Sequence, residues 1–257
     1  MTRRRWIADE FSADRAALTG AHAAHLTRIL RARVGQEFDV ACGANVYRAT
    51  VTSVADDRVE FTLGEEVTSP NVVPVTLLLA VFKFDRMEWA IEKCTELNVT
   101  TVVPVIASRT EKHLAQTAEK RVERWRRIAR EASEQSRRTA PPEITAPIKL
   151  AVALAQSAAH SDVVIPTEAS GGTRGLSEEA IRIVLAETER AITLADVLRA
   201  HADVHSLMLA IGPEGGWTPG ELQGFAAARY VSCSLGDTIL RAETAAIAAL
   251  AIARAEI

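Results

Sequence analysis

Two short segments in the last quarter of the chain carry residue types that can bind a ligand and do chemistry. The first, Ile211 to Gly216, reads Ile-Gly-Pro-Glu-Gly-Gly and ends the apolar run that begins at Leu207. Glycines at 212, 215 and 216 let backbone N–H and C=O groups approach a bound molecule. The segment therefore predicts a ligand site at the carboxyl end of a strand, with a structural turn as the plain alternative. A phosphate-binding loop is less favoured, because neither phosphate-loop glycine pattern is present and Glu214 would repel an anion.

The second segment, Leu235 to Thr244, reads Leu-Gly-Asp-Thr-Ile-Leu-Arg-Ala-Glu-Thr. Its Arg241 could stabilise developing negative charge, and its Glu243 could move a proton or orient a neighbouring group. Either segment alone could be an ordinary connection. Together, two strand-end loops of this composition predict one site if the fold makes them neighbours.

The elements that hold these loops can be placed from the sequence. Leu207 to Ile211 is predicted to be a buried strand. Thr218 and Glu221 form a Thr-x-x-Glu capping box with Pro219 at the first helical position, so a helix is predicted to begin there. The first loop is thus expected to be fixed at both ends.

The N-terminal third has a different period. Residues 36–67 predict a small antiparallel β unit with strands at Glu37–Cys42, Val46–Val54 and Val59–Leu63. A helix is expected before it, from His22 to Arg33, with Gly35 ending it. Residues 69–71 look like a linker.

Beyond residue 72 the pattern becomes that of parallel βαβ architecture. Strands are expected at Val75–Val81, Val99–Ile106, Asp162–Ile165, Leu207–Ile211 and Val231–Leu235, and helices at Arg86–Leu97, Lys120–Arg138 and Ala245–Ala253. We therefore predict an α/β protein with two domains, residues 1–71 and residues 72–257.

The charge of the chain is nearly balanced overall and uneven locally. Its 257 residues hold 30 Lys and Arg against 33 Asp and Glu, a net charge of −3, which taken alone argues against a strongly basic binder. Residues 1–33 hold seven Arg against three acids, and residues 119–138 hold eight Lys or Arg against four Glu, each a local +4. These segments are either solvated helix faces or parts of a surface for a polyanion.

Other classes of protein are not supported. Cys42, Cys94 and Cys233 are odd in number, far apart and in no Cys-x-x-Cys pattern, so we expect buried free thiols and no metal site. The N-terminus lacks the apolar stretch of a signal peptide, and no apolar run is long enough to cross a membrane. A soluble, cytoplasmic protein is expected.

The two C-terminal segments resemble the paired signature of the bacterial 16S ribosomal RNA uridine N3-methyltransferases, of the SPOUT class. The resemblance extends upstream over nearly the whole chain, to His25–Arg31, Arg86–Leu97, Pro104, Glu134–Arg137, Pro142 and Ile144. Asn98 stands where the family usually has Gly, and Ser133 where Cys is common. Residues 170–205 match poorly and are expected to be an elaboration.

This resemblance implies an N-terminal PUA-like β-barrel that binds RNA and a C-terminal SPOUT α/β domain whose chain forms a trefoil knot, a rare exception to the usual connection rules. It implies S-adenosylmethionine as cofactor, 16S ribosomal RNA as substrate, free or within the 30S subunit, and a homodimer with the site at the subunit interface. The residues that would hold the cofactor are Ile211, Gly212, Pro213, Glu214, Gly215, Gly216, Leu235, Gly236, Ile239, Leu240, Ala242 and Thr244, with Glu168 after the strand at Val163–Ile165 bordering the first loop.

In that reading Arg241 is the expected stabiliser of the uracil anion, and Glu243 is either the base or the residue that orients Arg241. His25 and Trp125 are expected to be packing residues. RNA is expected to contact one patch of arginines and a path of basic residues toward the cofactor, respectively Arg3, Arg4, Arg5, Arg28 and Arg31, and Lys83, Lys93, Arg137 and Arg138. Two rivals remain: an RNA-binding module without catalysis, and a nucleotide-dependent enzyme of Rossmann type.

Overall fold

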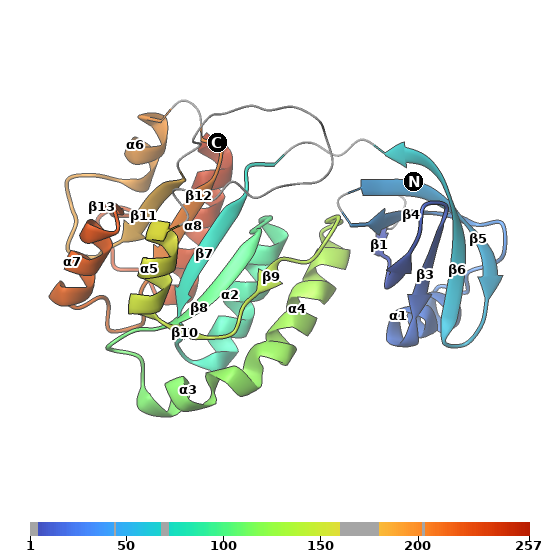
Figure 1. Cartoon of the computed structure of the whole chain (residues 1–257), viewed down its shortest axis with the longest axis horizontal. Coiled ribbons are helices and arrows are strands. Elements are labelled where there is room, and N and C mark those ends of the chain that lie inside the picture. The colour runs from blue at the N-terminus through green and yellow to red at the C-terminus, as the bar shows by residue number, and fades with distance from the viewer. Residues whose placement is uncertain (1–4, 44, 68–71, 160–179, 202–203) are drawn as a thin grey trace. The chain divides into compact units, whose positions relative to one another are not determined.

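The computed structural model describes residues 5–43, 45–67, 72–159, 180–201 and 204–257. Contacts divide the chain into two compact units (Figure 1). The first unit contains Met1–Val72 together with Arg130–Pro141, and the second contains Val73–Ala129 together with Pro142–Ile257. The sequence placed residues 130–141 in the second domain, whereas their contacts group them with the first unit.

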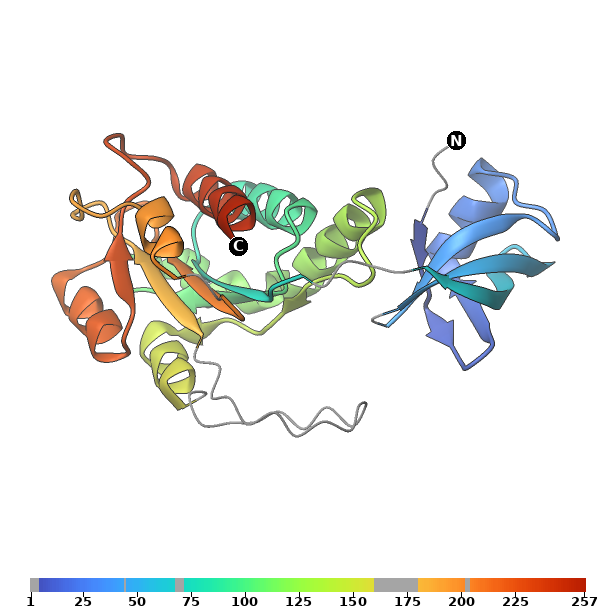
Figure 2. The ribbon, with the colours of Figure 1, turned by 90° about the horizontal axis from the view of Figure 1, so that it is seen from above.

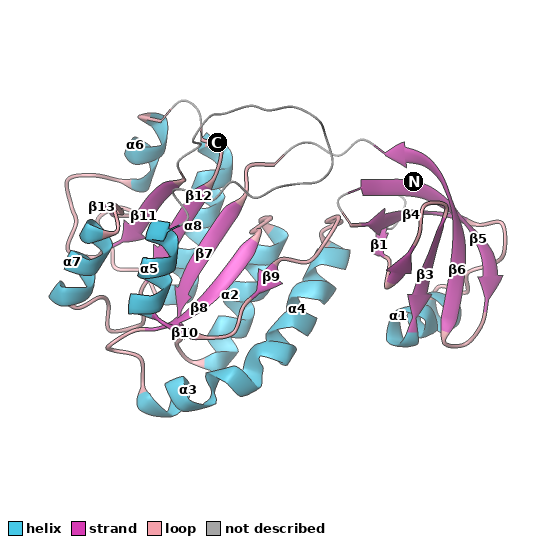
Figure 3. Cartoon of the chain, viewed as in Figure 1, coloured by secondary structure: helices cyan, strands magenta, loops and turns pink. Residues whose placement is uncertain are grey.

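The first unit is built on one curled six-stranded sheet (Figure 3). Its strand order is β1-β4-β5-β6-β3-β2, formed by β1 (Arg5–Ile7), β2 (Glu10–Phe11), β3 (Arg15–Thr19), β4 (Glu37–Cys42), β5 (Asn45–Val54) and β6 (Arg58–Val67). The antiparallel pairing of β4, β5 and β6 confirms the predicted β unit. Leu18, Leu26, Phe38 and Phe61 fill the core beneath the sheet.

The helix predicted at His22–Arg33 is wrong in extent. The structure has a short α1 (Gly20–Ala24) that continues as a π-helical turn, His25–Ile29. The turn stops before Arg31, whose φ of +52° is incompatible with continuing a right-handed helix. His25 packs edge-on against Trp6 with ring centroids 5.8 Å apart, which confirms its packing role.

Polar contacts explain why residues 130–141 belong to the first unit. The Arg130 guanidinium donates to the Asp9 carboxylate at 2.7 Å, and His22 Nε2 lies 3.2 Å from Glu134 Oε1. Burial raises the pKa of the Glu134 carboxyl against the opposing charges of His22 and Arg130. Ser133, in the same segment, is fully buried, so the small side chain there serves packing.

The second unit is an α/β structure around a parallel sheet, as predicted. The sheet order is β10-β8-β7-β12-β11-β13, with β9 beside β8, and its strands are β7 (Val75–Ala80), β8 (Thr101–Ile106), β9 (Glu143–Ile144), β10 (Ile148–Lys149), β11 (Ile181–Leu185), β12 (Leu207–Ile211) and β13 (Val231–Cys233). All of the pairings in this sheet are parallel. Its strands read as continuous apolar runs because both faces are covered.

Helices cover both faces of this sheet (Figure 2). They are α2 (Phe84–Glu96), α3 (Lys112–Thr117), α4 (Val122–Gln135), α5 (Leu150–Ala159), α6 (Leu194–Arg199), α7 (Pro219–Ala227) and α8 (Ala242–Glu256), with a 3-10 turn at Ala118–Arg121. Leu77 and Leu79 of β7 pack into the core with α2, α6 and α8, whereas Leu78 and Ala80 face the core with α5 and α7. Trp125 is fully buried in the first of these cores, which confirms its packing role.

The position of β11 corrects the sequence reading. The strand predicted at Asp162–Ile165 lies outside the described residues, and β11, Ile181–Leu185, was not predicted. Arg182 interrupts its apolar run, and the guanidinium is buried because it donates to the Ala228 carbonyl oxygen at 3.4 Å. The expectation that residues 170–205 form an elaboration is wrong for β11 and α6, since β11 pairs with both β12 and β13.

The end of α2 places Asn98 in a backbone conformation that usually favours Gly. Asn98 has a φ of +66°, its N–H donates to Thr95 O at 2.9 Å, and the Val99 N–H donates to Cys94 O at 3.0 Å. These are the two hydrogen bonds of a Schellman motif, whose left-handed residue is usually Gly. Arg254 of α8 donates to the Leu97 and Asn98 carbonyl oxygens, which neutralises the exposed carbonyls of this helix end.

We expect substitutions of Asn98 to change stability according to backbone strain alone. Asn98→Ala should lower the free energy of unfolding by about 1 kcal/mol, and Asn98→Gly should raise it by about 0.5 kcal/mol, because a Cβ is unfavourable at positive φ and Asn tolerates it better than Ala. Urea unfolding followed by far-UV circular dichroism measures both. An Ala variant as stable as the parent would contradict the strain assigned to this position.

Candidate functional site

The glycine-rich loop follows β12 and is anchored at its far end by a helix cap. Thr218 accepts the Glu221 N–H, and the Glu221 carboxylate accepts the Thr218 N–H at 2.7 Å, so the predicted capping box is confirmed with Pro219 in the first turn. Within the loop the Gly216 N–H donates to Pro213 O at 2.8 Å, and Gly216 has a φ of +69°. A tight turn with one left-handed residue therefore requires Gly at 216.

The segment after β8 supports this loop from outside. The Arg109 guanidinium donates to Gly215 O at 2.5 Å, and the Ser108 N–H donates to Glu221 Oε1 at 2.7 Å. Partial burial opposes ionisation of Glu221, but the N–H groups of Thr218 and Ser108 outweigh it and lower the pKa of the carboxyl. The loop backbone is thus held in place before any ligand binds.

Trp217 ties the loop to the neighbouring strand. Its indole N–H donates to the carbonyl oxygen of Leu185, the last residue of β11, at 3.0 Å. The ring packs edge-on against Phe225 with centroids 4.8 Å apart, and a Cβ placed on Gly212 would come within 3.3 Å of the same ring. Gly212 therefore allows the loop backbone to lie flat over the indole.

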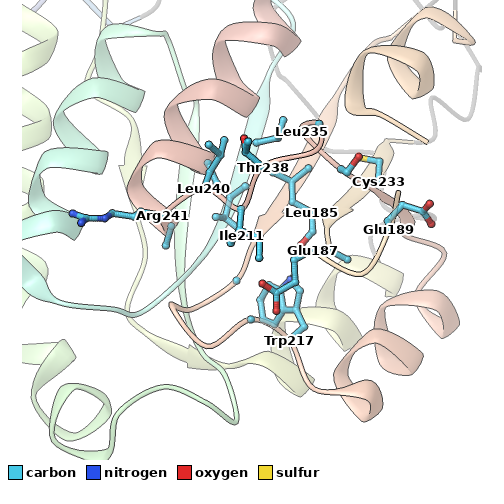
Figure 4. Close-up of a pocket in the computed structure, with 18 of the residues that line it drawn as sticks. Leu185, Glu187, Glu189, Ile211, Trp217, Cys233, Leu235, Thr238, Leu240 and Arg241 are labelled. Atoms are coloured by element: carbon cyan, nitrogen blue, oxygen red, sulfur yellow. Dashed lines mark hydrogen bonds between the residues drawn. The ribbon is translucent and has the colours of Figure 1, made fainter. Parts of the chain in front are cut away.

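The two predicted loops meet around one cavity of about 340 Å³, a size typical of small-molecule sites. Figure 4 shows its lining, which combines the ends of β11, β12 and β13 with the start of α8. Apolar side chains of Leu185, Ile211, Leu235 and Leu240 contribute much of the surface. The condition set by the sequence is therefore met, since the Gly-rich loop and the Arg- and Glu-bearing loop are neighbours.

The predicted cofactor residues divide into two groups. Those that line the cavity are Ile211, Gly212, Pro213, Glu214, Gly216, Leu235, Gly236, Ile239, Leu240 and Ala242. Gly215 lies in the glycine-rich loop and Thr244 in the first turn of α8, but neither is part of the lining, and Glu168 lies outside the described residues.

Arg86, on the first turn of α2, links two of the predicted acidic residues. Its guanidinium lies 3.2 Å from Glu214 in the glycine-rich loop and 3.7 Å from Glu243 on α8. The Glu243 side chain is 5% exposed, and its Oε2 has no hydrogen-bond partner among the described residues. Among the described residues, Arg86 is the cation that pairs with the buried carboxylate of Glu243, and it also lines the cavity.

Arg241 lies at the cavity edge and caps the start of α8. Its side chain is exposed and extends away from the apolar lining in Figure 4. No ion pair joins it to Glu243 among the described residues; the partner of Glu243 there is Arg86. The guanidinium of Arg241 is therefore available to a ligand at the cavity edge.

Cys233 also lines the cavity, but its thiol is not reactive. Burial, together with the nearby charge of Glu189, raises the pKa of its thiol to about 12, so the sulfur stays protonated near neutral pH. Cys42 and Cys94 are likewise buried and free, which confirms the expectation for all three cysteines.

The predicted RNA contacts fall in both units. Arg3 and Arg4 lie outside the described residues, while Arg28 and Arg31 are exposed in the first unit. The Arg5 guanidinium donates to the Arg137 carbonyl oxygen, so the segment with Arg137 and Arg138 adjoins the N-terminal strand.

Lys83 and Lys93 belong to the second unit. Lys83 is exposed just before α2. The Lys93 ammonium lies 2.8 Å from both Glu92 and Glu96, and these hydrogen bonds raise its pKa. Its charge is therefore already neutralised locally.

Several lining residues were missed by the sequence reading. Leu185 is the last residue of β11, and Glu187 comes shortly after it. The Ile-Arg-Ile-Val-Leu run of β11 is the strand signal that could have located both. Trp217 directly follows the predicted glycines, and Arg86 begins a segment that was predicted to be a helix and cited for its resemblance, without being named as a site residue. The link between Arg86 and Glu243 joins positions far apart in the sequence and has no local signal.

Metal and membrane sites receive no support within the described ranges. No cluster of three or more His, Cys, Asp or Glu side chains is placed there to hold a metal ion. Among the helices that the structure describes, none is both long and apolar enough to span a bilayer.

Comparisons with known proteins place this geometry in a family. The model of the RNA methyltransferase domain family matches residues 69–254. Ribosomal RNA small subunit methyltransferase E of Synechocystis is 32% identical over 91% of this chain and 71% of its own length, and the Bacillus subtilis protein of that name is 29% identical over 91% and 87%.

A solved structure supports the same assignment. Ribosomal RNA small subunit methyltransferase E from Neisseria gonorrhoeae, bound to S-adenosyl methionine, is 29% identical, covers 97% of this chain and 96% of its own, and superposes with a TM-score of 0.77. A putative methyltransferase from Legionella pneumophila, 22% identical with a TM-score of 0.76, shares the fold. Because the family match spans most of the chain and the Synechocystis relative matches nearly all of it, this chain belongs to the ribosomal RNA small subunit methyltransferase E family of RNA methyltransferases.

Proposed function

We propose that this protein transfers a methyl group from S-adenosylmethionine to N3 of a specific uridine in 16S ribosomal RNA. The observation that carries the proposal is the meeting of two strand-end loops, one rich in glycine and one bearing Arg241, around a single cavity in a member of this family. The related protein from Neisseria gonorrhoeae binds S-adenosyl methionine. A binding module without catalysis has no need for such a cavity.

The residues that line the cavity are themselves suited to binding S-adenosylmethionine. Leu185, Ile211, Leu235 and Leu240 offer apolar surface to an aromatic base. The backbone at Gly212 and Gly216 can be approached closely by a ligand. S-adenosylmethionine, when bound, supplies a methyl group already activated by its sulfonium, so the protein has to position the acceptor rather than generate a reactive group.

The remaining chemistry concerns the acceptor. Uridine N3 is a weakly acidic imide N–H on the Watson–Crick edge, so the base must be unpaired or extruded to reach the cavity. Transfer of its proton to solvent water leaves negative charge on O2 and O4, which the guanidinium of Arg241, unpaired among the described residues, would stabilise. Glu243 is assigned the role of orienting Arg86 rather than Arg241, because its carboxylate is held beside Arg86 and does not line the cavity.

The finer architecture follows the family. We assign residues 1–71 to a PUA-like RNA-binding domain, and residues 72–257 to a SPOUT domain whose cofactor loops form a trefoil knot. The strand order β7-β12-β11-β13, in which β11 lies between the two strands that carry the cofactor loops, supports the assignment of the α/β domain. A homodimer acting on the 30S subunit in the cytoplasm completes the proposal.

Methylation of 30S particles with S-adenosylmethionine labelled in the methyl group tests the reaction. After nuclease digestion, label should appear in 3-methyluridine, since N3 is the acceptor. The same assay on purified 16S RNA shows whether the assembled particle is required. Label in any other nucleoside would refute the assignment of the acceptor.

Arg241→Ala should lower kcat by about 100-fold, the usual effect of removing one donor to a developing oxyanion. Cofactor affinity, measured by calorimetry, should stay within about twofold, because the Arg241 side chain extends away from the apolar lining. Arg241→Lys, which keeps the charge, should recover part of the rate. Full activity of the Ala variant would remove the stabilising role from Arg241.

Arg28→Glu combined with Arg31→Glu should weaken RNA binding at least tenfold at moderate salt, since two favourable phosphate contacts become repulsive. Cofactor affinity should not change. Arg229→Glu is the matched control, because Arg229 is also an exposed arginine at positive φ, but in the second unit. Filter binding over a salt series measures all three proteins, and equal RNA affinity of the double variant and the parent would eliminate the patch.

A further inference from the structure

Glu187 differs from the other glutamates that line the cavity. Glu214 is paired with Arg86 at 3.2 Å. Glu189 accepts the N–H groups of Arg190 and Ala191 at 2.9 and 2.8 Å, and the Ala191 hydrogen bond is the main reason that its pKa is lowered. Glu187 has no hydrogen bond or ion pair to any residue that the structure describes.

The position of Glu187 is nevertheless well defined. It follows Ala186, whose N–H donates to Cys233 O at 3.0 Å, and the turn closes through the Glu189 N–H, which donates to Ala186 O at 3.1 Å. A Cβ built on Gly216 would lie 2.6 Å from Glu187 Oε1, so the carboxylate rests against the glycine backbone. Figure 4 shows it beside Trp217, whereas Glu189 is directed away from the centre of the cavity.

The Glu187 side chain is exposed at the cavity wall, so its carboxylate is open to a cationic donor from a ligand. S-adenosylmethionine carries two cationic groups, an α-ammonium with three N–H donors and a sulfonium with none. An ammonium can form charge-assisted hydrogen bonds to a carboxylate, which are about twice as strong as neutral ones. The ribose hydroxyls are neutral donors, and their hydrogen bonds to a carboxylate are weaker than those of an ammonium.

We propose that the Glu187 carboxylate binds the α-ammonium of the amino-acid portion of S-adenosylmethionine. This assignment rests on the proposed function and adds to it a residue that selects for the zwitterionic tail of the cofactor. It also gives Gly216 a second role, because any side chain there would displace the Glu187 carboxylate as well as strain the turn.

Calorimetry with three ligands tests the assignment. S-adenosylmethionine and S-adenosylhomocysteine both carry the ammonium and differ in the sulfonium, while 5′-methylthioadenosine keeps the adenosine and lacks the amino-acid tail. Glu187→Gln should weaken the first two ligands by about tenfold each, the effect of replacing a charge-assisted hydrogen bond by a neutral one, and leave methylthioadenosine unchanged. Glu119→Gln, which removes an exposed carboxylate of the second unit that does not line the cavity, should change none of the three by more than about twofold.

Each other result overturns the assignment in a recognisable way. An equal loss for methylthioadenosine would place Glu187 at the ribose or adenine, and a loss confined to S-adenosylmethionine would place it at the sulfonium. Unchanged affinities in the Gln variant would refute the contact while leaving the proposed function intact. If the parent protein binds none of the ligands, the proposed function fails together with this inference; thermal unfolding of each variant confirms that it is folded.

Discussion

The parallel pairing of β11 with both β12 and β13 is the constraint on which the site depends. It brings the carboxyl ends of three strands to the same edge of the sheet, and each strand then contributes a loop to one cavity. The indole N–H of Trp217 stabilises this arrangement, because it donates to the last carbonyl oxygen of β11 and so joins the loop after β12 to that strand. Arg109 and the Thr218 capping box hold the same loop from the other side.

Local signals predicted much of this structure. The strand Leu207–Ile211 and the capping box lie at the predicted residues, because each depends on a few adjacent side chains. β11 escaped prediction for the opposite reason. Its buried Arg182 donates to the carbonyl oxygen of Ala228, which lies 46 residues further along the chain. A sequence window contains the charge but not its partner.

The residues of the site also divide into those with a local sequence signal and those that depend on contacts between distant segments. Glycines and Arg241 could be recognised from their own segments, whereas the ion pairs of Arg86 with Glu214 and Glu243 depend on tertiary contact. The effect of the net charge likewise depends on where the fold places the charged side chains. A net charge of −3 conceals acids that are largely engaged inside the second unit, as at Glu214, Glu243 and Glu221, and exposed arginines such as Arg28 in the first.

The order of strands in the second unit also bears on how the protein acquires its site. β7 lies beside β12 although Val75 and its partner Leu207 are separated by most of the domain sequence, and the cavity requires the start of α8 near the end of the chain. Such long-range parallel pairing implies slow folding, because the entropy of closing large loops is lost before the contacts form. A cofactor that binds only the completed cavity stabilises contacts made after the folding transition state. It would therefore slow unfolding without accelerating folding, so the bound protein would gain kinetic lifetime.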